Sequence, residues 1–427
     1  MPKGKEYKIK YGGAITGPAE YKALDKSIKK SIRTGNWQLG EEAEKFVQEA
    51  SAYLGVKYGA ICNSGSSAGL LALAALELPK GSEVIIPAVT FPTIFNIIPQ
   101  LGLIPVVVDC IYPSYNASFA GILGGITEKT RAIIVVHAVG NPVDMPKLMK
   151  YIDEINSKRE NKIYVVEDNC DGWGSTIDIN CKSESDCRIW VDGRAEHNHE
   201  RNNKKVGSFG DISFTSFHAA HIVSMGVGGG VFTDNPILAR NVGMYRDWGR
   251  QANLTPRENT EFPNLPRDQN PRFIYEKLGY NFNCLELQAA MGRVQLKKTE
   301  KIKKARKRNF DYLYNEFQKM RMGGVDLVVP QWTPNADVCW FSFPLTIDSD
   351  RAPLLKHLED NGIETRTMFA GNILKHPSVK GVEFRQVGDL KCSDFILEHS
   401  FWVGLHPRYT PKDLKYMVDV FKKYFNA

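Results

Sequence analysis

Short apolar runs alternate with helical stretches along most of this chain. Residues 41–55 carry apolar side chains at helical spacing and end in glycine, which predicts a helix that stops there. The β-rich runs that follow are often apolar at consecutive positions, as strands buried between two helix layers must be. They are residues 58–62, 83–87, 104–109, 131–137, 163–168, 212–217 and 228–233. The alternation predicts an α/β fold with a mostly parallel seven-stranded sheet and helices on both faces.

The pattern changes in two places. A polar, charged stretch at 176–206 interrupts the rhythm and reads as a long surface insertion. Toward the C-terminus, a long helix from about 284 precedes the apolar run 339–347 and two further helices. We therefore expect a large domain at 1–280 and a smaller C-terminal α/β domain at 281–427. A length of 427 residues, 43% of them hydrophobic, suits two such domains.

Charge and cysteine usage narrow the class of protein. The net charge of +7 is modest, and the one dense basic run, 297–309, favours a solvated helix face over a nucleic-acid site. A basic balance also suits an anionic small molecule such as a sugar nucleotide. Neither a signal-peptide apolar region nor a run long enough to span a membrane is seen, and the eight cysteines are scattered. We expect a cytoplasmic protein with reduced thiols.

Three segments carry candidate chemistry. Small residues at 63–73 open a helix after a strand, where backbone N–H groups can approach a phosphate; a plain turn is the alternative. Asp168 ends an apolar strand, where it could pair with a protonated pyridine nitrogen or cap the next helix. Ser216 can donate its hydroxyl to a phosphate. His218 and His221 follow and suit a proton shuttle or a structural role.

Ordered motifs along almost the whole chain carry a family resemblance. The sequence resembles the DegT/DnrJ/EryC1/StrS sugar aminotransferases, in particular their dehydratase branch of CDP-6-deoxy-hexulose 3-dehydrase and GDP-4-keto-6-deoxymannose 3-dehydratase types. The motifs include RTGNWQLG (33–40), VEDNCDGWGS (166–175), SFHAAH (216–221), YRDWGR (245–250) and GYNFNCLELQAAMGRVQL (279–296). The resemblance implies the aspartate aminotransferase type I fold of pyridoxal phosphate-dependent transferases.

The resemblance also implies site residues. Asp168 would pair with the cofactor's ring nitrogen, Asp171 would lie near the ring hydroxyl, and Phe91 would stack on the ring. The cofactor phosphate would be held by Gly65, Ser66, Ser67 and Ser216. Asn281 would reach the cofactor of the neighbouring subunit, which implies a homodimer with shared active sites. Arg366 and Asn372 are candidates for substrate contact.

His221 occupies the position at which the aminotransferases of this family have lysine. An imidazole cannot bind the cofactor covalently as lysine does, so the cofactor would persist as pyridoxamine phosphate. The resemblance then implies removal of the C3 hydroxyl from a nucleotide-linked 4-keto-6-deoxyhexose, with His221 as acid and base, in deoxysugar biosynthesis. Two alternatives stay open. One is a conventional sugar aminotransferase with an unusual base, and the other is a non-catalytic cofactor-binding protein.

The source of reducing power divides the dehydratase branch. One group uses an iron–sulfur cluster and a separate reductase, and its cysteines follow the R-D-W-G-R motif. Residues 251–259 contain no cysteine, which favours the group that regenerates the cofactor from glutamate. The reductase-coupled reaction stays an alternative, because the RDWGR motif resembles the sequences of that group more closely. Cys181, Cys187, His197 and His199 match no trusted zinc motif, so we expect no metal site.

Overall fold

The computed structural model describes residues 7–180, 189–191, 194–196, 202–251, 262, 264–266, 269–322 and 325–425. Its largest element is a mixed sheet with the order β1-β11-β10-β5-β4-β2-β3-β17. The strands are β1 (Tyr58–Cys62), β2 (Glu83–Pro87), β3 (Ile104–Val108), β4 (Thr130–Val136), β5 (Tyr164–Asp168), β10 (Ile212–Ser216), β11 (Gly229–Thr233) and β17 (Arg385–Gln386). All seven predicted runs form strands of this sheet, and only β11 pairs antiparallel with its neighbours.

The expectation of seven strands is wrong by one, because β17 adds an eighth at the edge. This two-residue strand pairs with β3, and the Arg385 guanidinium donates to both carboxylate oxygens of Glu83, at 2.8 and 2.7 Å. A third bond runs to the Gly125 carbonyl. The strand consists of an arginine and a glutamine, so no apolar pattern marks it in the sequence. The ion pair between Arg385 and Glu83 holds it in place.

Helices cover both faces of the large sheet. Alternate strand residues point to opposite faces: Val84 and Ile86 pack with α3 and α4, whereas Ile85 packs with α5 and α6. The helices of this part are α1 (Pro18–Thr34), α2 (Glu41–Leu54), α3 (Gly65–Ala74), α4 (Pro92–Gln100), α5 (Phe119–Gly125), α6 (Met145–Asn156) and α8 (Pro236–Arg246), with short η1 (Ala138–Gly140). This three-layer arrangement is the predicted fold class.

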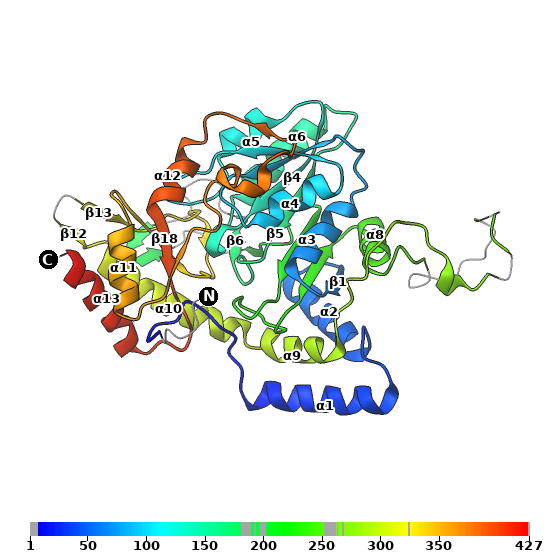
Figure 1. Cartoon of the computed structure of the whole chain (residues 1–427), viewed down its shortest axis with the longest axis horizontal. Helices are drawn as coiled ribbons and strands as arrows, with labels where there is room; N and C mark the ends of the chain where they lie inside the picture. The colour runs from blue at the N-terminus through cyan, green and yellow to red at the C-terminus, as the bar shows by residue number, and fades with distance from the viewer. Residues whose placement is uncertain are drawn as a thin grey trace.

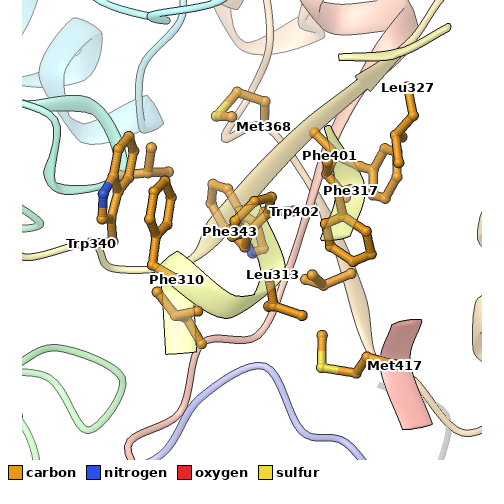
Figure 2. Packing of buried hydrophobic residues seen from close by; sticks show 14 of the residues in the cluster. Phe310, Leu313, Phe317, Leu327, Trp340, Phe343, Met368, Phe401, Trp402 and Met417 are labelled. Carbon is orange, nitrogen blue, oxygen red and sulfur yellow. The ribbon is translucent and has the colours of Figure 1, made fainter. Parts of the chain in front are cut away.

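A second, five-stranded sheet has its own core. Its order is β12-β13-β15-β18-β16. In its core the aromatic rings of Phe310 and Trp340 stack on each other with centroids 4.4 Å apart (Figure 2). The strands are β12 (Arg321–Met322), β13 (Val325–Val328), β15 (Phe343–Ile347), β16 (Thr365–Thr367) and β18 (Ser400–Val403). The helices are α9 (Glu286–Leu296), α10 (Thr299–Phe317), α11 (Ala352–Asp360), α12 (Lys391–His399) and α13 (Pro411–Phe425), with short η3 (Pro271–Phe273), η4 (Ile373–Lys375) and η5 (Pro377–Val379).

Chain segments cross between the two predicted domains. α9 packs against α1 and α2, and Figure 1 shows α1 running beside α9 along the lower edge of the molecule. In the segment that precedes α1, Ile9 is fully buried in a core formed mainly by residues from Phe310 onward. Its N–H bonds the Gly362 carbonyl at 3.0 Å, and its carbonyl accepts from Glu364 N–H at 2.9 Å. The N-terminal segment therefore packs in the core of the second sheet, which we call the C-terminal unit.

The ends of the predicted surface insertion belong to a small sheet instead. β6 (Thr176–Asp178) lies antiparallel to β9 (Asn203–Lys205) and to β14 (Ala336–Asp337), and all three residues of β6 are buried. The short strands β7 (Ile189–Val191) and β8 (Arg194–Glu196) pair with each other. The cysteines and histidines considered as zinc ligands, Cys181, Cys187, His197 and His199, lie outside the described residues.

Two members of the basic run at 297–309 are buried, so the predicted solvated helix face accounts for only part of this run. Lys303 donates to the Gly174 carbonyl at 2.9 Å and pairs with Asp337 at 2.8 Å. Arg306, 2% exposed, donates to the carbonyls of Trp340 and Phe341. A buried cation must be hydrogen-bonded, and these bonds tie α10 to the loops around the cavity described below. Within the described chain, no helix combines the length and apolarity that a membrane span needs.

Candidate active site

A cavity of about 410 Å³ opens where the carboxyl ends of β5 and β10 meet the N-termini of α3 and α4. Ligands of open α/β sheets bind at such strand ends. Among the expected residues, it is lined by Gly65, Ser66, Phe91, Asp168, Asp171, Ser216, His221 and Arg366. Ser67, Asn281 and Asn372 are absent from that wall. The size suits a small-molecule ligand.

The start of α3 forms a cradle for an anion. Ser64 caps the helix by accepting a bond from the Ser67 N–H at 3.1 Å, and the Ser67 hydroxyl is 3.0 Å from the Ser64 hydroxyl. A Cβ atom on Gly65 would lie 2.5 Å from Ser216 Cβ, so only glycine lets the end of β10 approach this closely. The Ser66 hydroxyl bonds Thr93 at 2.8 Å. Free helix N–H groups beside two serine hydroxyls suit a phosphate.

Asp168 is a buried carboxylate that forms no ion pair with any of the described residues. Its side chain is at the end of β5, 5% exposed, and accepts a bond from the Cys170 N–H at 3.0 Å. Burial raises the pKa of Asp168 to about 6, and the negative charge of Asp171 adds to the effect. A positive partner would reverse that rise. The environment therefore fits a protonated ring nitrogen facing this carboxylate.

His221 lies beside the second acidic residue. A tight turn places it: the His221 N–H donates to the His218 carbonyl at 3.0 Å, and the His218 N–H donates to the Ser216 hydroxyl at 3.3 Å. His221 Nδ1 is 3.4 Å from Asp171 Oδ1, and these side chains are 16% and 8% exposed. The Nδ1 atom is buried and forms no hydrogen bond with the described residues, so its link to Asp171 is the ion-pair distance alone. The nitrogen left to act on a ligand in the cavity is therefore Nε2.

Aromatic side chains make up much of the remaining wall. Phe91, the N-cap of α4, is 59% exposed although it is a large apolar residue, as expected for a ring that awaits a stacking partner. Sequence reasoning missed Tyr11, Phe341, Phe369 and Trp402. The Phe341 ring centre is 5.3 Å from that of His221. These residues come from the N-terminal segment and the C-terminal unit, and no local pattern marks them as site residues.

The two candidates for substrate contact have different surroundings. Arg366 lines the cavity, with its guanidinium 4.4 Å above the Tyr11 ring centre and 2.5 Å from Glu364 Oε1. Asn372 is 2% exposed and donates to Asp394 at 2.7 Å, outside the cavity wall. This bond links Asn372 to α12, and contact between Asn372 and a substrate stays a prediction. Asn281 is exposed and bridges Asp247 through its backbone.

Lysine is missing from the cavity wall as far as the described residues go. The lysines of β9 turn elsewhere: Lys204 lies over the Phe209 ring and Lys205 over the Tyr53 ring. The anion cradle, the exposed Phe91 ring and the buried Asp168 fit a phosphorylated pyridine cofactor. None of these described side chains could anchor such a cofactor covalently as a lysine does, and His221 lines the same cavity.

Comparison with known proteins supports this interpretation of the cavity. The model of the DegT/DnrJ/EryC1/StrS aminotransferase family matches residues 18–422. The lipopolysaccharide biosynthesis protein RfbH of Salmonella typhimurium is 33% identical, over 97% of this chain and 91% of its own. The dTDP-4-dehydro-2,6-dideoxy-D-glucose 3-dehydratase of Saccharopolyspora spinosa is 34% identical, over 89% of this chain and 79% of its own.

Solved structures with the same architecture include sugar dehydratases. The E. coli GDP-4-keto-6-deoxy-D-mannose-3-dehydratase with bound hydrated PLP superposes with a TM-score of 0.82, at 25% identity, covering 97% of this chain and 99% of that one. A GDP-4-keto-6-deoxymannose-3-dehydratase with a trapped PLP–glutamate geminal diamine gives 0.80 at 26% identity, covering 96% and 99%. The fold is therefore that of the pyridoxal phosphate-dependent aminotransferases.

Proposed function

The chain belongs to the DegT/DnrJ/EryC1/StrS aminotransferase family, and from this premise we propose that it is a sugar-nucleotide 3-dehydratase. Its substrate is a nucleotide-linked 4-keto-6-deoxyhexose, and its cofactor is pyridoxamine 5′-phosphate, which cycles with pyridoxal 5′-phosphate. The observation that carries the proposal is His221 beside Asp171 in a cavity whose described wall has no lysine. Relatives named as 3-dehydratases and as a lipopolysaccharide biosynthesis protein support a deoxysugar product.

The residues of the cavity divide the work of holding the cofactor. Gly65, Ser66 and Ser216 bind the phosphate at the start of α3, with Ser67 shaping the cradle through Ser64. Phe91 would stack on the ring, and Asp168 would hold the ring nitrogen protonated, since the ionised carboxylate would then have a cation opposite it. When bound, the cofactor supplies an amine that joins the sugar's C4 carbonyl and a ring that accepts an electron pair.

His221 moves the proton. Asp171 faces Nδ1, which orients the ring and leaves Nε2 to take a proton and return it to the departing C3 hydroxyl, as base and then acid. The structure thus supports a positioning role for Asp171, and the ring-hydroxyl contact implied by the family resemblance stays a prediction. Phe341 and the other aromatic residues exclude water from this face of the cavity.

Glutamate is the proposed amine donor that restores the cofactor. The absence of cysteine from residues 251–259 supports a cycle without an iron–sulfur cluster, and so does the PLP–glutamate diamine trapped in the related dehydratase. The reductase-coupled cycle is the competing candidate. An absorbance spectrum taken before and after glutamate is added to the pyridoxal phosphate-loaded protein tests the choice. Conversion to the pyridoxamine spectrum supports glutamate, and a brown, iron-containing protein refutes it.

Asn281 extends the proposal to a homodimer with shared sites. The residue is exposed and lies outside the cavity of its own chain, which suits a contact with the cofactor of a second copy. Mixing two inactive variants, His221→Asn and Asn281→Ala, tests this. A heterodimer of the two contains one site with both native residues, so activity returns on mixing. Two variants that stay inactive in a mixed dimer refute shared sites.

The reaction itself is tested with purified protein. The protein is loaded with pyridoxamine phosphate, given GDP-4-keto-6-deoxymannose or a dTDP-linked 4-keto sugar, and the nucleotide products are weighed by mass spectrometry. We expect a 4-keto product that lacks one oxygen atom, together with ammonia, and no product from His221→Asn. A clean 4-amino sugar, with the C3 hydroxyl kept, would show a conventional aminotransferase instead.

A further inference from the structure

The proposed reaction gives no task to the second histidine of the cavity. His218 lines the same wall as His221, and the two ring centres are 6.4 Å apart with planes nearly perpendicular, at 78°. His218 is the more exposed of the two side chains. The His218 imidazole is thus an exposed polar group in a wall that also contains the aromatic rings of Tyr11, Phe91, Phe341, Phe369 and Trp402.

The turn after β10 fixes the tautomer of His218. Its Nδ1 accepts a hydrogen bond from the Ala220 N–H at 3.3 Å, and its own N–H donates to the Ser216 hydroxyl at 3.3 Å. A neutral imidazole carries one proton, and an Nδ1 that accepts leaves that proton on Nε2. His218 therefore offers one N–H donor on the edge of the ring that is turned away from its own backbone.

The surroundings of His218 keep the ring neutral. Within the described chain no carboxylate pairs with it; its burial, and then the neighbouring His221, lower its pKa. His221 differs because it has Asp171 at 3.4 Å. The other titratable side chains of the described wall are Tyr11, Asp168, Cys170 and Arg366. The two histidines of this cavity therefore have different environments. Different environments allow two side chains of the same type to take different roles in one site.

We propose that His218 is a further substrate-binding residue: its Nε2–H donates a hydrogen bond to an oxygen of the hexose and turns the sugar's C3 side toward His221. The inference rests on the proposed dehydratase function. A hexose presents oxygen atoms around its ring, so a fixed donor at one side selects one orientation. Because the donor keeps its proton, His218 holds the substrate while His221 carries out proton transfer.

Two variants of this residue separate the donor from the shape of the side chain. His218→Gln places an amide N–H near the position of Nε2, whereas His218→Phe keeps the ring and removes the donor. One neutral hydrogen bond contributes about 1 kcal/mol net, or roughly five- to tenfold. We expect His218→Phe to weaken binding of the sugar nucleotide about tenfold and His218→Gln to stay within about threefold of the native protein. The cofactor spectrum should be unchanged in both.

Binding is measured by calorimetry on the cofactor-loaded protein with the His221→Asn background, so that no turnover occurs. The dependence of kcat/KM on pH is measured on His218→Phe and His218→Gln proteins that keep the native His221. The pH profile should keep its shape in both variants. Equal affinity of the His221→Asn protein with and without His218→Phe would overturn the inference. Loss of one limb of the pH profile would overturn it too, because it would mark His218 as a proton donor. If the native protein forms no 3-deoxy product, the proposed function fails, whereas a binding change confined to His218→Phe still supports the contact.

Discussion

Replacing Asp168 by asparagine should make the cofactor-free protein more stable while abolishing its activity. Burial raises the pKa of Asp168 to about 6, from an ordinary value near 3.8. Because the folded-state pKa is the higher one, the folded chain binds this proton more tightly, and stability falls as the pH rises from about 4 to about 6. That difference corresponds to about 3 kcal/mol of destabilisation above pH 6. Asparagine keeps an oxygen for the Cys170 N–H and carries no charge.

The assay is thermal unfolding of both proteins, with and without pyridoxamine phosphate, at pH 8 and pH 4. Without cofactor, Asp168→Asn should unfold at a higher temperature at pH 8, and the two proteins should converge at pH 4. With cofactor the order should reverse, because the ring nitrogen supplies the missing cation. Asp25→Asn, on the exposed face of α1, is the matched control and should change little. A cofactor-free Asp168→Asn that is less stable than the native protein at pH 8 would refute the reasoning.

Three further substitutions test the site and its supports. Asp171→Asn should lower kcat about a hundredfold with a smaller change in KM, because His221 loses its orienting partner; an unchanged kcat contradicts this. Gly65→Ala places Cβ 2.5 Å from Ser216 Cβ and should weaken cofactor binding at least tenfold by titration, whereas Gly124→Ala, with no atom within 4 Å, should bind normally. Arg306→Met leaves two buried carbonyls without a donor and should cost about 2 kcal/mol by thermal unfolding, unlike the exposed Lys304→Met.

The strands of the large sheet could be predicted because burial on both faces demands runs of apolar residues, and each run is visible in the sequence. Asp168 and Ser216 could be placed because each ends such a run. β17 could not be predicted, since its two polar residues are held by the Arg385–Glu83 pair rather than by an apolar pattern. The burial of Lys303 and Arg306 was hidden for a similar reason: partners such as the Gly174 and Trp340 carbonyls are far away in sequence.

The cavity itself was predictable only in part. Local motifs indicated the phosphate cradle and His221, and the family resemblance assigned Asp171 a role near the cofactor. The contact between His221 and Asp171, which lie 50 positions apart, depends on the register of β5 against β10. The wall formed by Tyr11, Phe341 and Trp402 depends on how the C-terminal unit docks. Neither of these contacts between distant parts of the chain can be recognised from a single sequence.

The burial of Ile9 in the C-terminal core has a consequence for the order of assembly during synthesis. The ribosome releases residues 7–16 long before residues 362–364, with which Ile9 forms its backbone bonds. The early segment can therefore form these bonds only after most of the large sheet has been synthesised. Tyr11 and Arg366 meet only at the end of this process, so a nascent chain arrested before that point has the phosphate cradle but an open pocket. Completion of the pocket therefore requires translation at least as far as Trp402, which also lines it.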